Sequence, residues 1–192
     1  MADDLGARAR EVHAAAQGVL TFWFDETTEE QWFAKDDTLD RTIAARFGAL
    51  RDAVLASGAA GWDGDPDTLL AAIILLDQFS RNIHRGSREA FAADSLSLDL
   101  THRALARGWD ETIAPERRAF LYMPLMHAED REEQRLSVDC FTRLGNAENL
   151  DFARKHRAVI DRFGRFPSRN QALGRVSTEA EKAYVSQPGA GW

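Results

Sequence analysis

Apolar side chains recur at intervals of three or four residues along most of the sequence, and this spacing restricts the fold more than any other feature. The clearest run comprises Leu39, Ile43, Phe47, Leu50 and Val54. Residues at these intervals share one face of an α-helix, because the helix completes a turn about every 3.6 residues. No stretch alternates apolar and polar residues over a strand's length. The sequence therefore predicts an all-α protein.

Proline and glycine divide this pattern into helices joined by short turns. Asp65-Pro66 and Pro115 stand where helices are expected to begin, and Thr178 and Glu181 have the spacing of a capping box. The predicted helices end at five glycines: Gly58, Gly86, Gly108, Gly145 and Gly164. Helices of about 15 residues with short connections pack as antiparallel neighbours. We therefore expect an antiparallel helical array.

Length and composition favour one domain in a reducing compartment. Residues 1–192 are expected to form a single helical domain, because one core serves roughly 100–200 residues. The longest apolar run, Leu69–Leu76, is far shorter than the roughly 20 residues that span a bilayer, so no membrane association is predicted. The N-terminus lacks the features of a secretory signal, and the lone Cys140 cannot form an intramolecular disulfide. We therefore expect a cytoplasmic protein.

The charge distribution indicates what kind of partner the protein binds. The net charge of −7 argues against a nucleic-acid partner, because such domains are usually basic. Residues 152–175 nevertheless contain seven Lys and Arg against one Asp. This basic stretch predicts a local anion site within an acidic chain. We expect no cofactor, and the sequence does not indicate an oligomeric state.

The most apolar helical stretch ends in a polar segment, Leu75–Asn82. Asp77 and Arg81 lie four residues apart, as do Gln78 and Asn82, so each pair shares a helix face. A charge buried without a partner is costly, so these side chains need partners in the fold or in a ligand. We take Asp77, Arg81 and Asn82 as candidate ligand-binding residues. The alternative is a structural ion pair.

A second polar segment follows a proline inside a helical pattern. Pro124 is expected to kink or break its helix, because proline lacks the N–H for one backbone hydrogen bond. His127 and Glu129 follow, and a histidine beside carboxylates can bind a metal or act as a general base. No paired histidine accompanies His127 at helical spacing, so no metal site is predicted. His127 and Glu129 are candidate catalytic residues for acid–base chemistry.

The third segment, Arg162–Asn170, begins where a helix is expected to end at Gly164. Ser168 is predicted to cap the next helix, with Gln171 three residues later. A helix N-terminus presents free N–H groups and the positive end of the helix dipole, so it attracts anions.

Arginines surround this predicted helix start. The candidate ligand-binding residues of the segment are Arg165, Arg169, Asn170 and Arg175. Guanidinium groups can hold a phosphate or carboxylate through two parallel hydrogen bonds. The alternative is that the arginines bind Asp77, Glu129 or Asp130 inside the fold. His156 lies on an apolar stripe and is expected to be a hydrogen-bonded core histidine.

These segments resemble those of an uncharacterised, mostly bacterial family, domain of unknown function nine-two-four. The matching motifs are Val19–Phe24, Trp32-Phe33, Leu76–Asn82, Phe120–His127 with Glu129-Asp130, His156, Arg162–Asn170 and Leu173–Thr178. The resemblance spans most of the chain. It implies an all-helical fold similar to tetratricopeptide-repeat domains, and it implies no activity.

The chain departs from the family pattern at three positions. Ser80 stands where the family often has proline, Ala128 where it often has serine, and Ser168 where histidine is common. A role that needs a hydroxyl after His127 or an imidazole before Arg169 is therefore not expected here.

Two functions are consistent with these features. In the first, an arginine-rich site binds a small phosphorylated or carboxylated ligand, and His127 with Glu129 supplies acid–base or hydrolytic chemistry if the protein is an enzyme. No activated nucleophile is evident, so the sequence leaves that question open. In the second, the helical array binds a protein or an acidic peptide, and the polar segments are structural.

Overall fold

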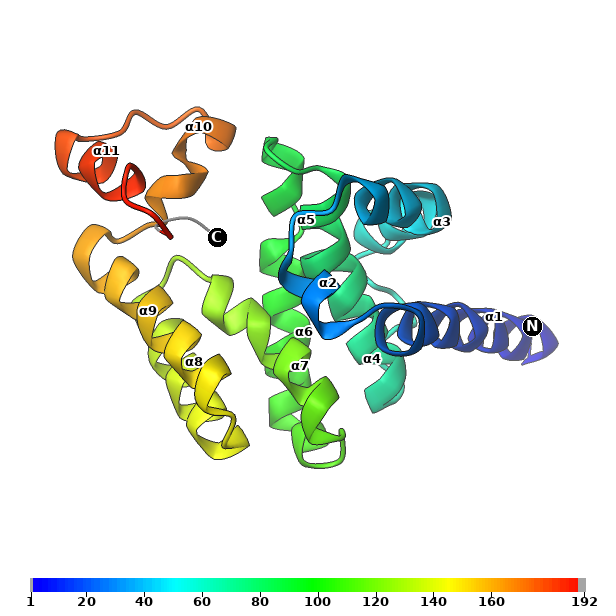
Figure 1. The fold of residues 1–192 in the computed structure, drawn as a ribbon. Helices are drawn as coiled ribbons and strands as arrows, with labels where there is room; N and C mark the ends of the chain where they lie inside the picture. The colour runs from blue at the N-terminus through cyan, green and yellow to red at the C-terminus, as the bar shows by residue number, and fades with distance from the viewer. Residues whose placement is uncertain (1, 190–192) are drawn as a thin grey trace. The chain divides into compact units, whose positions relative to one another are not determined.

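The structure, a computed structural model, describes residues 2–189. Within this range all regular secondary structure is helical, which confirms the predicted all-α fold (Figure 1). The described residues form two compact units. The N-terminal unit comprises residues 2–85 and 89–124, and the C-terminal unit comprises residues 86–88 and 125–189. That the chain is a single domain stays a prediction.

The N-terminal unit contains the helices of the first two-thirds of the chain. In order they are α1 (Ala2–Thr21), the π-helix η1 (Phe22–Glu26), α2 (Glu29–Phe33), α3 (Asp37–Ala56), α4 (Pro66–Ile73), the π-helix η2 (Ile74–Phe79), α5 (Ser80–Ile83), the 3-10 turn η3 (Arg88–Phe91), α6 (Asp94–Ala106), the 3-10 turn η4 (Trp109–Glu111) and α7 (Pro115–His127). Boundaries between the units fall within α7, after Pro124, and within η3, after Arg88, so Arg88 belongs to the C-terminal unit. None of the helices in the described range is long and apolar enough to cross a membrane.

The core of the N-terminal unit is the continuous segment of α4 and η2. Every residue from Leu69 to Phe79 is buried, as its apolar run predicts. Helices α1, α3 and α6 contact this segment, and Trp23 lies edge-on against both Phe79 and Phe120. Asp65 caps α4 by accepting the Thr68 N–H, with Pro66 in the first helical turn, as predicted.

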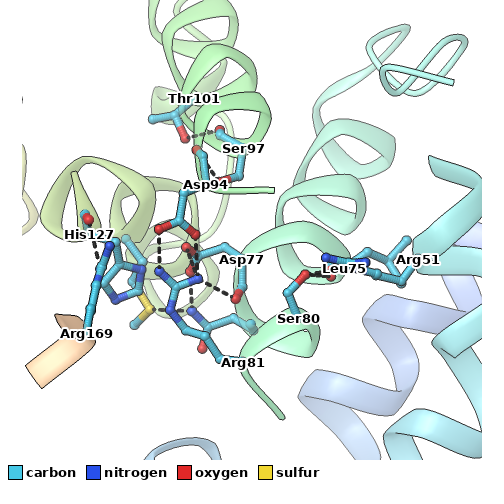
Figure 2. A network of polar contacts seen from close by, with 12 residues as sticks. Arg51, Leu75, Asp77, Ser80, Arg81, Asp94, Ser97, Thr101, His127 and Arg169 are labelled. Carbon is cyan, nitrogen blue, oxygen red and sulfur yellow. Dashed lines mark hydrogen bonds and ion pairs between the residues drawn. The ribbon is translucent and has the colours of Figure 1, made fainter. Parts of the chain in front are cut away.

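The second half of this core segment is a π-helix, although its apolar spacing predicts a regular α-helix. A π-helix closes its hydrogen bonds over one residue more than an α-helix does. The Ser80 hydroxyl, 3.5 Å from the Leu75 carbonyl oxygen, spans the same interval of five residues, and it accepts a hydrogen bond from Arg51 Nε at 2.8 Å (Figure 2). Single π-helical turns are rare and often lie at functional sites. Here the π-helix carries Asp77.

The C-terminal unit is built on a helical hairpin. Its elements are the end of α7, α8 (Arg131–Leu144), α9 (Ala147–Phe163), the 3-10 turn η5 (Pro167–Arg169), α10 (Asn170–Leu173) and α11 (Glu179–Val185). Helices α8 and α9 pack side by side (Figure 1). They end at Gly145 and Gly164, whose φ angles of 80° and 71° are left-handed, as the sequence predicts. Thr178 and Glu181 form the predicted capping box of α11.

The structure decides one local alternative and corrects one local prediction. Helix α7 contains Pro124 and continues to His127, so of the two expected effects of the proline, a kink or a break, the break does not occur. Ser168 lies inside η5, where Pro167 takes the first position and no side chain caps the turn. The predicted capped helix is therefore two short turns, η5 and the four-residue α10. Because so few peptide units are aligned, the helix-dipole argument for an anion site does not hold here.

Candidate functional site

In the N-terminal unit, Arg81 joins two carboxylates (Figure 2). Its Nη1 atom lies 3.0 Å from Asp77 Oδ1 and 3.1 Å from Asp94 Oδ1, and it also donates to the Asp77 carbonyl oxygen at 2.8 Å. Asp77 is fully buried. Burial disfavours the charged guanidinium, but the charges of Asp77 and Asp94 raise the pKa of Arg81 above its usual value. The two residues predicted to share a helix face are thus an ion pair.

Asn82 belongs to a different cluster, centred on Asp40 of α3. The Asn82 Nδ2 atom donates to Asp40 Oδ1 at 2.8 Å, and Arg85 donates to both oxygens of the same carboxylate at 2.8 and 2.9 Å. Burial raises the pKa of Asp40, but the hydrogen bonds from Arg85 and Asn82 outweigh it and leave this pKa below its usual value. Gln78, predicted to share a helix face with Asn82, donates to Asp77.

In the C-terminal unit, two side chains bind the carbonyl groups at the end of α7. Gln134 Nε2 lies 2.6 Å from the Met126 oxygen, 2.8 Å from that of Ala128 and 3.4 Å from that of Leu125. Arg169 Nη2 donates to the remaining carbonyl, that of His127, at 2.9 Å (Figure 2). The last carbonyls of a helix have no partner within it, so these contacts stabilise the turn between α7 and α8.

The Glu129 carboxylate connects this turn to the basic segment. Its Oε1 atom accepts the Phe166 N–H at 2.9 Å, and Arg175 Nη1 lies 2.9 Å from Oε1 and 2.8 Å from Oε2. Asp130, the neighbouring acid, instead caps α8 by accepting the N–H groups of Glu132 and Glu133. Of the carboxylates suggested as internal partners of the basic segment, Glu129 holds Arg175.

Arg165 is held by Glu181 of α11. Its Nε and Nη2 atoms donate to the two oxygens of that carboxylate at 2.6 and 2.9 Å, and Nη2 also donates to the Val176 carbonyl. The hydrogen bond from Arg165, supported by the Thr178 N–H, lowers the pKa of Glu181 to about 2. This two-pronged contact fixes α11 against the end of α9.

Asn170 closes the loop that follows η5. Its carbonyl accepts the Arg175 N–H at 2.8 Å, and its Nδ2 atom donates to Ser177 Oγ at 3.0 Å. Asn170 is 1% exposed, and its Oδ1 atom has no hydrogen-bond partner in the described part of the chain. Arg88 reaches the same loop and donates to the Leu173 carbonyl at 3.1 Å.

The two histidines of this unit lie near one another. The rings of His127 and His156 have centroids 6.1 Å apart, and His156 also lies edge-on to Phe166. His156 is 4% exposed, with Nδ1 2.8 Å from the Phe152 carbonyl oxygen, so it is the predicted hydrogen-bonded core histidine. Among residues 2–189, no group of three or more His, Cys, Asp or Glu side chains is arranged to hold a metal ion.

The predicted site residues thus divide between the units. Asp77, Arg81 and Asn82 lie in the N-terminal unit. Those of the C-terminal unit are His127, Glu129, Arg165, Arg169, Asn170 and Arg175. Their roles toward a ligand or in catalysis stay predictions.

Four further residues complete these clusters without a clear sequence signal. They are Arg88, Asp94, Gln134 and Glu181. Glu181 is recognisable only as a capping-box residue. Gln134 reads as an ordinary polar helix position, because nothing local indicates that its partners are carbonyl groups of the preceding helix.

Comparison with known proteins identifies relatives without an assigned activity. Residues 19–189 match a family described as bacterial protein of unknown function (DUF924). A solved structure of a protein of unknown function from Agrobacterium tumefaciens is similar, with a TM-score of 0.86 and 34% sequence identity, over 91% of this chain and 98% of that one. No curated protein matches the chain.

Proposed function

Since the chain belongs to the DUF924 family of bacterial proteins of unknown function, as its motifs predict, we propose a function from the site itself: the C-terminal unit binds a small ligand carrying a phosphate or carboxylate group. The ligand lies at the loop of residues 170–177, beside Arg88. The observation that carries the proposal is the buried Asn170 amide, which has one atom without a partner in the described chain.

A buried polar atom without a hydrogen bond costs about 1–3 kcal/mol, so native structures rarely leave one unexplained. Ser177 can either donate or accept, so its hydroxyl does not decide which end of the Asn170 amide faces it. The other end is left to bind a ligand donor or acceptor. Because Asn170 is 1% exposed, the ligand reaches it only when the 170–177 loop shifts.

Arg88 supplies the positive charge for the anion. Arg165 and Arg175 are each neutralised by a carboxylate, Glu181 and Glu129. Arg88 is exposed and donates to a neutral carbonyl. A guanidinium has five N–H donors, so one such contact leaves several for a phosphate or carboxylate.

The acid–base role proposed for His127 and Glu129 depends on Arg175. The Glu129 carboxylate is occupied by Arg175 and the Phe166 N–H. An anion that draws Arg175 to itself would release one carboxylate oxygen of Glu129, two residues from His127 in the sequence, for proton transfer. Asp77, Arg81 and Asn82 have no part in this proposal.

Thermal unfolding in the presence of inorganic phosphate, sugar phosphates, nucleotides and dicarboxylates tests the proposal. A ligand at a hundred times its Kd stabilises a protein by about 2.7 kcal/mol, which raises the Tm of a chain of this size by roughly 5–10 °C. Arg88→Gln should abolish that rise, whereas Arg135→Gln, which removes an exposed cation of α8, should leave it intact. The proposal fails if no anion raises the Tm or if both variants respond alike.

The second candidate function is a protein- or peptide-binding domain whose polar motifs are structural. The observation that favours it is that Arg165, Arg169 and Arg175 all bind groups of their own unit. The same thermal-unfolding measurement separates the two functions. A response to acidic or C-terminal-carboxylate peptides, together with none to free anions, supports the peptide-binding function.

A further inference from the structure

The first half of the buried face of α8 is polar, although the spacing of its apolar residues predicts an apolar stripe. The spacing of Leu136, Cys140 and Leu144 suggests that these residues face the core. In the structure Cys140 is buried, but Leu136 and Leu144 are only half-buried, and Gln134 and Ser137 are 0% exposed. The face of α8 that meets its neighbours therefore begins with two polar side chains one turn apart.

Each of these two side chains has a buried polar atom without a partner. Gln134 uses its Nε2 atom on the carbonyl groups at the end of α7. Its Oε1 atom, and the Oγ atom of Ser137, have no hydrogen-bond partner among residues 2–189. Amide flipping does not remove the problem for Gln134, because carbonyl groups can accept only from its NH₂ end.

We propose that a buried water molecule binds between Gln134 and Ser137. Gln134 and Ser137 lie three residues apart, so their side chains are neighbours on one face of α8. A water that makes hydrogen bonds of about 2.8 Å to both oxygen atoms would satisfy them. It donates to Gln134 Oε1 and exchanges a second hydrogen bond with Ser137 Oγ. Such waters typically join two or more otherwise unsatisfied buried groups.

The water connects the interior of the α8–α9 hairpin to the turn that carries His127 and Glu129. Gln134 holds this turn through its NH₂ group, and the water fixes the opposite end of the same amide. Gln134 therefore has a positioning role that does not depend on any ligand at the 170–177 loop.

Ser137→Ala gives the first test, because the sign of its effect on stability depends on whether the water is present. If the water is present, the variant removes one of its partners, and the Tm falls below that of the unchanged protein. If it is absent, the variant removes an unsatisfied buried hydroxyl, and the Tm stays the same or rises. Ser97→Ala is the matched control, since Ser97 is equally buried and its hydroxyl donates directly to the Asp94 carbonyl at 2.9 Å.

Direct observation gives the second test. A high-resolution crystal structure should show an ordered water within hydrogen-bond distance of both Gln134 Oε1 and Ser137 Oγ, and the Ser137→Ala structure should show it weakened or lost. A crystal structure without that water, or a Ser137→Ala Tm at or above that of the unchanged protein, overturns the proposal.

Discussion

Replacing Gln134 by leucine tests whether the α7–α8 turn depends on a single buried amide. Leucine is close to glutamine in size, so the change removes hydrogen bonds without opening a large cavity. The Gln134 NH₂ group has two hydrogens, and its two shortest contacts are to Met126 and Ala128 at 2.6 and 2.8 Å. The variant therefore leaves two carbonyl groups of the turn without their present donor.

The size of the effect follows from these two contacts. Each carbonyl left unsatisfied in a buried position costs about 1–3 kcal/mol. Removal of the Oε1 atom offsets part of this loss, so we expect a net destabilisation of about 2–4 kcal/mol. For a chain of this size that lowers the Tm by at least about 4 °C.

Urea unfolding and calorimetry of Gln134→Leu and the unchanged protein measure the difference. Arg135→Ala is the control, because Arg135 is adjacent in sequence but exposed and paired with the exposed Glu132. We expect that control to change stability by less than about 0.5 kcal/mol. A Gln134→Leu protein as stable as the unchanged one would refute the reasoning that this amide holds the turn.

Two further predictions concern ion pairs and buried hydrogen bonds. Arg165 lowers the pKa of Glu181 to about 2 in the folded protein. The stability that the pair contributes is therefore fully present above about pH 4.5 and is lost as the pH falls towards 2. Glu181→Gln should flatten that part of a Tm–pH profile, and an unchanged profile would contradict the assignment. Ser80→Ala should cost about 1.5–3 kcal/mol, because buried Arg51 loses its Nε acceptor; a loss below about 0.5 kcal/mol in urea unfolding would show that Arg51 is satisfied without it.

Helix positions could be predicted because local residues determine them. Asp65-Pro66, Gly145 and the Thr178–Glu181 capping box all act within one helical turn. The π-helical form of η2 could not be predicted, because an extra residue in one turn leaves a continuous apolar run unchanged. The spacing of Leu136, Cys140 and Leu144 identifies the buried Cys140 but not the buried Gln134 and Ser137, because apolar spacing does not reveal polar residues that face the core.

The residues of the site could be predicted from the sequence, but the partners of most of them could not. The sequence indicates that Arg165, Arg169 and Arg175 need partners, and it names Glu129 as one alternative. It does not indicate that Glu181 takes Arg165 or that a carbonyl group takes Arg169. Those choices depend on how the chain returns on itself after Gly164, which no spacing of residues encodes.

The additional residue within η2 also sets the angular position of everything that follows it in the same helix. Each residue of an α-helix turns the chain by about 100°. The wide turn of η2 takes up this residue in about the rotation that an α-helix gives to one residue fewer, so α5 keeps the direction that places Arg81 beside Asp94 and Ser80 beside Arg51. Winding the same sequence as a regular α-helix would rotate α5 by about that angle and separate both pairs. A change that closes the wide turn should therefore break both contacts without altering any of the four residues.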